Sequence, residues 1–192
     1  MDAEFPPSLL SMGYNKTIAT GSLSKAYSLA GIRVGWIASR DPSIVEKCAE
    51  TRHYTTISVS QLDEQVAAFA LGPATIHALL SRNIQLARTN LEILEKFVNK
   101  HDEECEWVRP TAGTTAFVKF QRDGRPVDDV ELCKRLIEKT GVMFVPGSQC
   151  FGEEWKGYVR IGYVCETEVL RDGLKKVQTF LRKEFDELPL AT

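Results

Sequence analysis

Two nearby stretches decide how this chain folds: TGSLSK at Thr20–Lys25 and GIRVGW at Gly31–Trp36. The first begins where a short β-branched run, Lys16–Thr20, predicts a buried strand, so its lysine lies in a polar turn at the end of that strand. A second short strand is predicted over Val34–Ser39. Two short strands cannot bury both of their faces, and parallel strands need cover on both sides. We therefore expect residues 1–72 to belong to a larger α/β domain.

The polar groups of these stretches suit an anion such as phosphate. Ser22 and Ser24 supply hydroxyls, Arg33 supplies a guanidinium, and the glycines around them let backbone N–H groups approach closely. A lysine beside such a site, here Lys25, can form a Schiff base with an aldehyde. The alternative is a surface lysine in a turn together with a structural arginine.

The full pattern S-x-S-K-x5-G-x-R-x-G-W resembles the cofactor-lysine signature of class I/II aminotransferases, which are fold-type I pyridoxal 5'-phosphate (PLP) enzymes. The resemblance implies that Lys25 is the Schiff-base lysine and moves the proton during amino transfer. It also implies that Ser22 and Arg33 bind the phosphate of PLP, with Ser24 as a neighbouring contact. The expected substrates are an amino acid and a 2-oxo acid.

A second match lies downstream, in VPGSQCFG at Val145–Gly152 and YVRIGY at Tyr158–Tyr163. It resembles the family's PG-x-x-F-G and VRI segments, in which the arginine pairs with the substrate carboxylate through two parallel hydrogen bonds. Arg160 is therefore the candidate for holding that carboxylate. The alternative is an arginine in an edge strand, satisfied by a nearby acid such as Glu153 or Glu154. The stretch Gly113–Thr115 resembles the family's strand entry near the substrate, but we interpret it as structural.

The order of predicted elements indicates three regions. One helix is predicted to begin at Asp41-Pro42, and further helices are predicted over Gln61–Leu71, Ala74–Lys100, Val127–Lys139 and Glu166–Phe185. Gly141 closes the helix that ends at Lys139, and the helix that begins at Glu166 is poorly capped. Strands are predicted over Trp107–Arg109, Thr114–Phe120, Val142–Val145 and Tyr158–Val164, with a turn at Pro146-Gly147. The regions are a partial large cofactor-binding domain (1–72), a long interdomain helix (73–101) and a small C-terminal domain (102–192). The expected fold class is α/β: a remnant of the large PLP-binding domain, with a partial, mostly parallel sheet and helices, plus a complete-looking α+β small domain.

Composition argues against several other classes of protein. The chain has 192 residues and a formal net charge of -2, with no basic run, so neither a nucleic acid nor a membrane surface is an expected partner. No apolar stretch approaches the roughly 20 residues needed to cross a bilayer, and the first residues lack the pattern of a signal peptide. The five cysteines are widely spaced without CxxC, and the three histidines lie far apart, so we expect no disulfide framework and no metal. These features predict a cytoplasmic protein.

The resemblance covers nearly the whole chain, but only the carboxy-terminal half of a family member. In the family an aspartate pairs with the ring nitrogen of PLP and keeps it protonated, which lets the ring accept electrons. Asp2, in the context MDAEF, does not match that motif. We therefore expect the chain alone to bind PLP weakly and to transaminate poorly.

Three possibilities for the assembly and the reaction stay open at this point. The sequence could be a truncated family member, which would form a homodimer at full length, or it could be completed by a second chain that supplies the missing half. The reaction could be amino transfer or another fold-type I reaction, such as β-elimination or an ACC-synthase-like cyclisation. The chain could also be a non-catalytic partner subunit.

Overall fold

The computed structural model describes residues 7–192 of the 192-residue chain. The chain divides into two units, one ending at Asn83 and the other beginning at Ile84. Asp2, discussed above, lies outside the described residues. Within residues 7–192, no helix is both long and apolar enough to cross a membrane.

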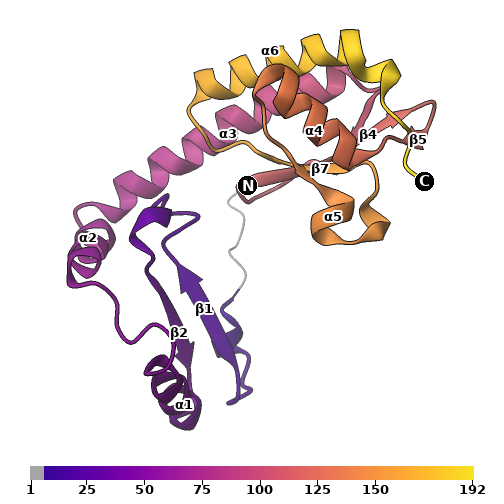
Figure 1. Ribbon diagram of the computed structural model, residues 1–192. Helices are drawn as coiled ribbons and strands as arrows, with labels where there is room; N and C mark the ends of the chain where they lie inside the picture. Colours follow the sequence, from indigo (N-terminus) through magenta and orange to yellow (C-terminus); the bar gives the residue numbers. More distant parts are fainter. Residues whose placement is uncertain (1–6) are drawn as a thin grey trace. The chain divides into compact units, whose positions relative to one another are not determined.

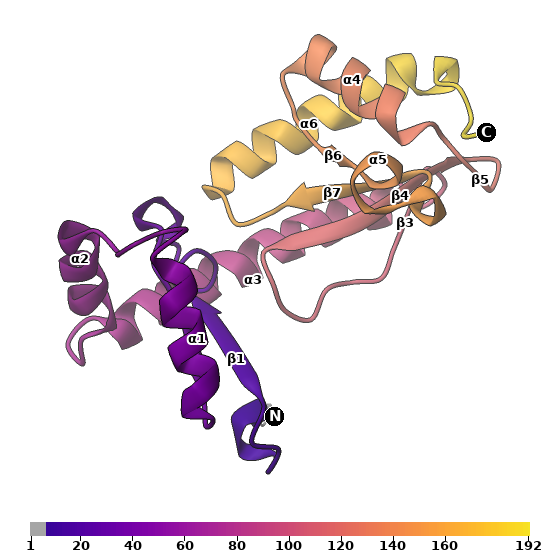
Figure 2. The same ribbon diagram turned by 60° about the horizontal axis from the view of Figure 1, so that its bottom comes forward.

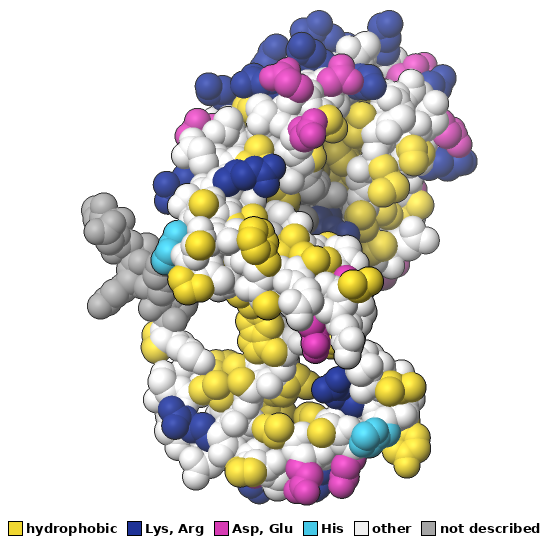
Figure 3. Space-filling view, turned by 90° about the vertical axis from the view of Figure 1, so that its left-hand side faces the viewer, with side chains coloured by type: hydrophobic (Ala, Val, Ile, Leu, Met, Phe, Trp, Pro, Cys, Tyr) yellow, Lys and Arg dark blue, Asp and Glu magenta, His cyan; other side chains and the backbone are white. Residues whose placement is uncertain are grey.

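The first unit combines a pair of short strands with two helices (Figure 1). Its elements are η1 (Leu9–Ser11), β1 (Ile18–Ser22), η2 (Ala30–Ile32), β2 (Gly35–Ser39), α1 (Pro42–Arg52) and α2 (Gln61–Leu71). No residue of β1, β2 or α1 is buried, and Leu62 and Phe69 of α2 are 80% and 73% exposed. Figure 3 shows such hydrophobic side chains open on one face of the molecule. This exposure agrees with the expectation of a partial domain.

The strands β1 and β2 run antiparallel, with Ile18 opposite Ser39 and Ser22 opposite Gly35. The α/β class with a partial sheet is confirmed, but the expectation of parallel strands is wrong for this pair. The reason is the connection, because residues 23–34 form turns and η2 but no α-helix. Parallel neighbours need a crossover, usually a helix, whereas a short link returns the chain in the opposite direction.

The helices of the first unit begin where the sequence signals predict. Asp41 caps α1 by accepting a hydrogen bond from the N–H of Ser43 at 2.9 Å, and Pro42 occupies the first turn. Hydrogen bonds from the hydroxyl and the N–H of Ser43 hold the pKa of Asp41 below its usual value. Helix α2 has the predicted bounds, and Ser60 caps it. Side-chain caps at Asp41 and Ser60 thus coincide with the starts of these two helices.

The second unit is an α+β arrangement joined to the long helix α3 (Figure 2). Helix α3 (Ile76–Lys100) runs across the division between the units. The remaining elements are β3 (Cys105–Trp107), β4 (Thr115–Arg122), β5 (Arg125–Pro126), α4 (Asp129–Thr140), β6 (Val145–Pro146), α5 (Gly147–Phe151), η3 (Glu153–Trp155), β7 (Tyr158–Gly162), α6 (Thr167–Glu184) and η4 (Phe185–Glu187). The strand order is β3-β4-β7-β6, all antiparallel, with β5 paired to β4.

The sheet of the second unit has a core face and an open face, because successive residues of a strand point to opposite sides. Ala116, Val118 and Phe120 of β4 are buried in the core cluster with side chains of α3, α4 and α6. Figure 1 shows these three helices on one side of the sheet. Phe117 points to the other side, where its register partner on β7 is Arg160. The candidate substrate residue therefore lies on the open face.

Most predicted elements of the second unit are confirmed, with ends shifted by no more than two residues. Asp128 caps α4 by accepting hydrogen bonds from two backbone N–H groups at 3.0 and 2.9 Å. Gly141, with φ of 74°, closes α4 in the left-handed conformation, as predicted. Glu166 precedes α6 without any side-chain cap, which confirms that it is a poor cap.

The region around Gly147 differs from the prediction. The strand expected over Val142–Val145 is reduced to Val145–Pro146, and the turn expected at Pro146-Gly147 is instead the start of α5. Gly147 meets a different requirement, because a Cβ there would lie 2.6 Å from the carbonyl oxygen of Trp155. Pro-Gly is a strong turn signal in sequence. Here the glycine permits close packing of the backbone.

Candidate functional site

The predicted cofactor residues lie on one loop of the first unit. Ser22 ends β1, Ser24 and Lys25 lie in the turn after it, and Arg33 lies just before β2. The strand pairing continues into this loop, because the N–H of Leu23 donates to the carbonyl of Val34 at 3.1 Å. The strand pairing thus brings the ends of the loop at Ser22 and Arg33 near each other, and Ser24 and Lys25 lie between them in the chain.

The two serines form a hydrogen-bonded pair. The hydroxyl of Ser22 donates to Oγ of Ser24 at 3.0 Å and accepts a hydrogen bond from the N–H of Ser24 at 3.1 Å. Ser22 is exposed and Ser24 half-buried. Both hydroxyls are therefore held at the end of β1, on the loop that carries Lys25.

The backbone around Lys25 is anchored, while its side chain is exposed. Leu23 is 0% exposed, and its carbonyl accepts a hydrogen bond from Leu29 at 2.9 Å. The carbonyl of Lys25 accepts one from the N–H of Ser28, also at 2.9 Å. Nδ2 of Asn83 donates to the carbonyl of Ala26 at 2.9 Å. Asn83 was missed from the sequence, where nothing near it in the chain points to this loop.

Arg33 has an unusual backbone for a residue with a side chain. Its φ of 52° and ψ of 37° are left-handed, which costs on the order of 1 kcal/mol outside glycine. Its Nη1 donates to the carbonyl of Ala30 at 3.1 Å, and within residues 7–192 no carboxylate forms an ion pair with it. Gly35 allows the strands to approach, since a Cβ there would lie 2.8 Å from the carbonyl oxygen of Gly21. The guanidinium therefore keeps donors for an anion.

These groups fit PLP. Two hydroxyls and a guanidinium without a carboxylate partner can bind a phosphate dianion. An exposed amine on the same loop can condense with an aldehyde. The chemistry of these side chains is therefore compatible with a phosphate and an aldehyde.

Arg160 lies on β7 in the second unit, away from the sheet edge. Strand β7 is flanked by β4 and β6, and in the described part of the chain Arg160 makes no ion pair. Glu153 pairs instead with Lys156 at 2.8 Å. The alternative of an edge-strand arginine satisfied by Glu153 or Glu154 is therefore wrong. The Arg160 guanidinium carbon lies 5.5 Å from the ring centre of Phe151, a cation–π contact.

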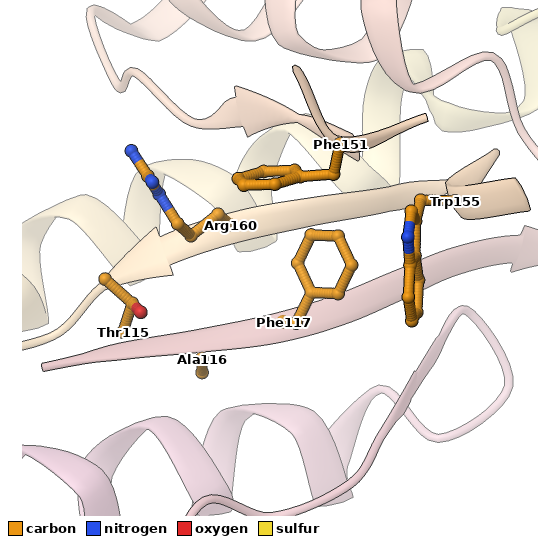
Figure 4. Close-up of a pocket in the computed structure, with 6 residues that line it drawn as sticks. All are labelled: Thr115, Ala116, Phe117, Phe151, Trp155 and Arg160. Atoms are coloured by element: carbon orange, nitrogen blue, oxygen red, sulfur yellow. The ribbon is translucent and has the colours of Figure 1, made fainter. Parts of the chain in front are cut away.

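A pocket of about 380 Å³ opens beside Arg160. It is lined by Thr115, Ala116, Phe117, Phe151, Trp155 and Arg160. Figure 4 shows Arg160 and Thr115 at one end, Trp155 at the other, and the rings of Phe117 and Phe151 between them. The volume is within the range of small-molecule sites. The pocket therefore has a cationic end and an aromatic end.

Sequence reasoning missed the aromatic wall of this pocket. The ring centre of Phe117 lies 5.4 Å from that of Phe151, 5.1 Å from Trp155 and 5.0 Å from Tyr158. The signal was present in Thr114–Phe120, where Phe117 alternates with the buried residues of the strand.

The stretch Gly113–Thr115 serves two purposes. The carbonyl of Gly113 accepts a hydrogen bond from the hydroxyl of Tyr163 at 2.7 Å, which is the structural role expected for this stretch. Thr115 instead lines the pocket, so the structural role expected for the whole stretch does not describe this residue.

The buried thiols of the second unit are poor candidates for chemistry. Burial, with the nearby charge of Asp129, raises the pKa of Cys133 to about 12. Burial also raises the pKa of Cys105 strongly, and that of Tyr163, which Arg109 partly opposes. Buried thiols that do not ionise are weak nucleophiles. Residues 7–192 contain no group of three or more His, Cys, Asp or Glu arranged for a metal ion.

Comparison with known families gives the class of protein. The family described as aminotransferase class I and II matches residues 2–178, and the chain belongs to that family. The resemblance found from the two motifs is confirmed, and membership implies PLP as the cofactor.

Three relatives define the similarity further. The chain is 34% identical to capreomycidine synthase of Streptomyces vinaceus over 168 residues, which cover 87% of this chain and 41% of that protein. The structure of a PLP-dependent aminotransferase from Streptococcus suis matches with a TM-score of 0.78 and 38% identity, over 88% of this chain and 43% of that one. The PLP-dependent cyclase OrfR matches with a TM-score of 0.76 and 28% identity, over 86% and 43%. The chain thus spans less than half the length of these relatives, in agreement with the expected half of a family member.

Proposed function

We propose that this chain supplies the cofactor loop and the substrate-carboxylate arginine of an enzyme that transfers an amino group between an amino acid and a 2-oxo acid. The observation that supports the proposal is the loop after β1, which carries Ser22, Ser24, Lys25 and Arg33 in a member of the aminotransferase family. Arg160, exposed on β7 without an acidic partner in the described chain, supports the second part.

Each residue has a distinct role in this proposal. Ser22 and Arg33 would bind the cofactor phosphate, with Ser24 beside them, and Nζ of Lys25 would hold the cofactor. When bound, PLP supplies an aldehyde for the substrate amine and a ring that accepts electrons from the substrate Cα. Nζ of Lys25, once released, would accept the proton from that Cα. The planar fork of Arg160 would orient the substrate through its carboxylate.

A second candidate is a different PLP-dependent reaction, such as β-elimination or an ACC-synthase-like cyclisation. The similarity to a synthase and to a cyclase favours it, at 34% and 28% identity. Those reactions would use the same lysine and arginine. Incubation of the active protein with an amino acid separates the two candidates, because only amino transfer requires an added 2-oxo acid and converts it stoichiometrically to an amino acid.

We also propose how the protein is organised. The division into a partial large domain (1–72), an interdomain helix (73–101) and a small domain (102–192) follows the order of its elements. The remaining part of the family fold would come from a longer form of this chain, acting as a homodimer, or from a second chain. A cytoplasmic location is our inference from the number and spacing of the cysteines.

Titration with PLP tests the attachment. We expect an absorbance band in the near-ultraviolet or visible range that is lost in Lys25→Ala and retained in Lys16→Ala, a change at another exposed lysine of the first unit. Reduction with borohydride followed by peptide mass spectrometry should place the label on Lys25. A label on other lysines would reject the role of Lys25. If high PLP gives no band, even with a co-expressed amino-terminal half, the non-catalytic partner is the correct alternative.

A further inference from the structure

The pocket beside Arg160 has the chemistry of a specificity site. Of the six residues that line it, Arg160 alone is charged, and the far end is built from rings (Figure 4). Phe151 is 44% exposed and Trp155 37% exposed, so large apolar surfaces face open space. Exposed apolar surface beside a single cation is the pattern expected for an amphipathic ligand.

We propose that this pocket selects substrates with an aromatic side chain, and that Phe117 and Trp155 are the specificity-determining residues. The proposal rests on the proposed function, because it places the substrate carboxylate at Arg160 and the side chain against the rings. The ring of Phe151 is engaged by Arg160, whose guanidinium carbon lies 5.5 Å from the ring centre. The rings left for a substrate side chain are those of Phe117 and Trp155, whose centres lie 5.1 Å apart.

The lining argues against a charged substrate side chain in this pocket. A carboxylate in the substrate side chain would need a second cation in the pocket, and an amine there would need an acid. Apart from Arg160, the described residues that line the pocket are Thr115, Ala116 and three aromatic residues, which are all uncharged. An aromatic side chain needs neither. It would pack edge-to-face or offset against rings that already meet at 63° and 80°.

The aromatic wall is also held in place before any ligand binds. Phe151 and Trp155 lie between Ser148 and Gly157, and both of these are anchored by Asp129, which is 1% exposed. Asp129 accepts hydrogen bonds from the N–H of Ser148 at 2.9 Å and of Gly157 at 3.1 Å. A fixed wall loses less entropy on binding, which favours selective recognition.

Binding of unreactive carboxylates to the 192-residue chain tests the proposal without PLP. The probes are 3-phenylpropionate, propionate (no ring) and 3-phenylpropanamide (no charge). Trp155 provides the readout, because the chain has three tryptophans and therefore three indole N–H signals in a nitrogen-15 spectrum. Trp155→Phe assigns the signal of Trp155.

We expect 3-phenylpropionate to shift the Trp155 signal and to bind at least tenfold more tightly than either other probe, which is about 1.4 kcal/mol. Phe117→Leu should remove the advantage over propionate, and Arg160→Gln the advantage over the amide. Trp155→Leu, which lacks the indole signal and is therefore measured by calorimetry, should also remove the advantage over propionate. Phe69→Leu, a change at an exposed ring of α2, should change neither. Circular dichroism establishes that each variant is folded.

Two results would overturn the proposal. One is binding of 3-phenylpropionate within twofold of propionate, and the other is a response of Trp36 or Trp107 without one of Trp155. The probes carry no amine, so their binding needs neither Lys25 nor PLP. The two experiments therefore fail separately. A pocket without preference for 3-phenylpropionate would not change the PLP absorbance band, and a missing PLP band would not change the binding of 3-phenylpropionate.

Discussion

Asp129 is the anchor whose removal should damage the second unit most clearly. It begins α4, and its carboxylate accepts three hydrogen bonds from residues far along the chain. Two come from the N–H and hydroxyl of Ser148, both at 2.9 Å, and one comes from the buried N–H of Gly157 at 3.1 Å. The perturbation is Asp129→Ala, which leaves both N–H groups without this acceptor.

The expected loss follows from the number of donors. A buried donor left without a partner costs about 1–3 kcal/mol, and the part-buried N–H of Ser148 should cost less than the buried N–H of Gly157, so the expected loss for Asp129→Ala is about 3 kcal/mol. Asp129→Asn retains one carbonyl oxygen and should cost about 2 kcal/mol. Ser148→Ala is the matched control, because it removes the hydroxyl but retains both backbone hydrogen bonds, and should cost about 1 kcal/mol.

Urea unfolding of the second unit, followed by near-ultraviolet circular dichroism and by amide hydrogen exchange at Gly157, measures these losses. The order should be Asp129→Ala, then Asp129→Asn, then Ser148→Ala, with faster exchange at Gly157 in the first two only. Equal destabilisation by Asp129→Ala and Ser148→Ala, with unchanged exchange at Gly157, would refute the anchoring role.

Three further predictions concern the cofactor loop, the backbone at α5 and the thiols. Arg33→Ala should weaken PLP binding about tenfold to a hundredfold, as expected for a charge-assisted hydrogen bond worth about 1.5–3 kcal/mol, and Arg52→Ala should leave the titration unchanged. Gly147→Ala should lower the free energy of unfolding by about 2 kcal/mol, because the added Cβ would meet backbone atoms. Gly162→Ala should leave the free energy of unfolding unchanged, because no atom lies within 4 Å of the added Cβ, and urea midpoints test both variants. The pKa of Cys133 is raised from 9.0 to about 12, so its contribution to stability is complete below pH 9 and is lost as pH rises toward about 12. Cys133→Ala should flatten that loss of stability in unfolding measured from pH 8 to 11, and an unchanged slope would contradict the assignment.

Local signals predicted much of the fold. Asp41 and Gly141 act at helix ends as predicted, because capping depends on a few neighbouring atoms. Asp128, which lies inside the helix predicted from Val127, is instead the cap of α4. The antiparallel pairing of β1 with β2 was not accessible in the same way, since strand direction depends on how the link at residues 23–34 is folded.

The parts of the candidate site also differ in how far sequence could predict them. The cofactor loop could be found from sequence because Ser22, Lys25 and Arg33 lie close together in the chain. The aromatic wall could be found only in part. The alternation along β4 places Phe117 opposite the core side chains, but its contact with Trp155 depends on the pairing of β4 with β7 and on the anchoring of residues 148–157. Gly147 was misinterpreted for a similar reason, because its neighbour is a carbonyl eight residues away in the chain.

The alternation along β4 has a consequence for how this protein can change. Positions 115 and 117 face the pocket, and positions 116, 118 and 120 face the core. New ligand preferences could therefore be explored by substitution at 115, 117 and 155 with little effect on core packing. Insertion or deletion of a single residue within β4 would exchange the two sets, exposing the core residues and burying the pocket residues. Directed evolution of this strand should therefore tolerate replacements and reject length changes.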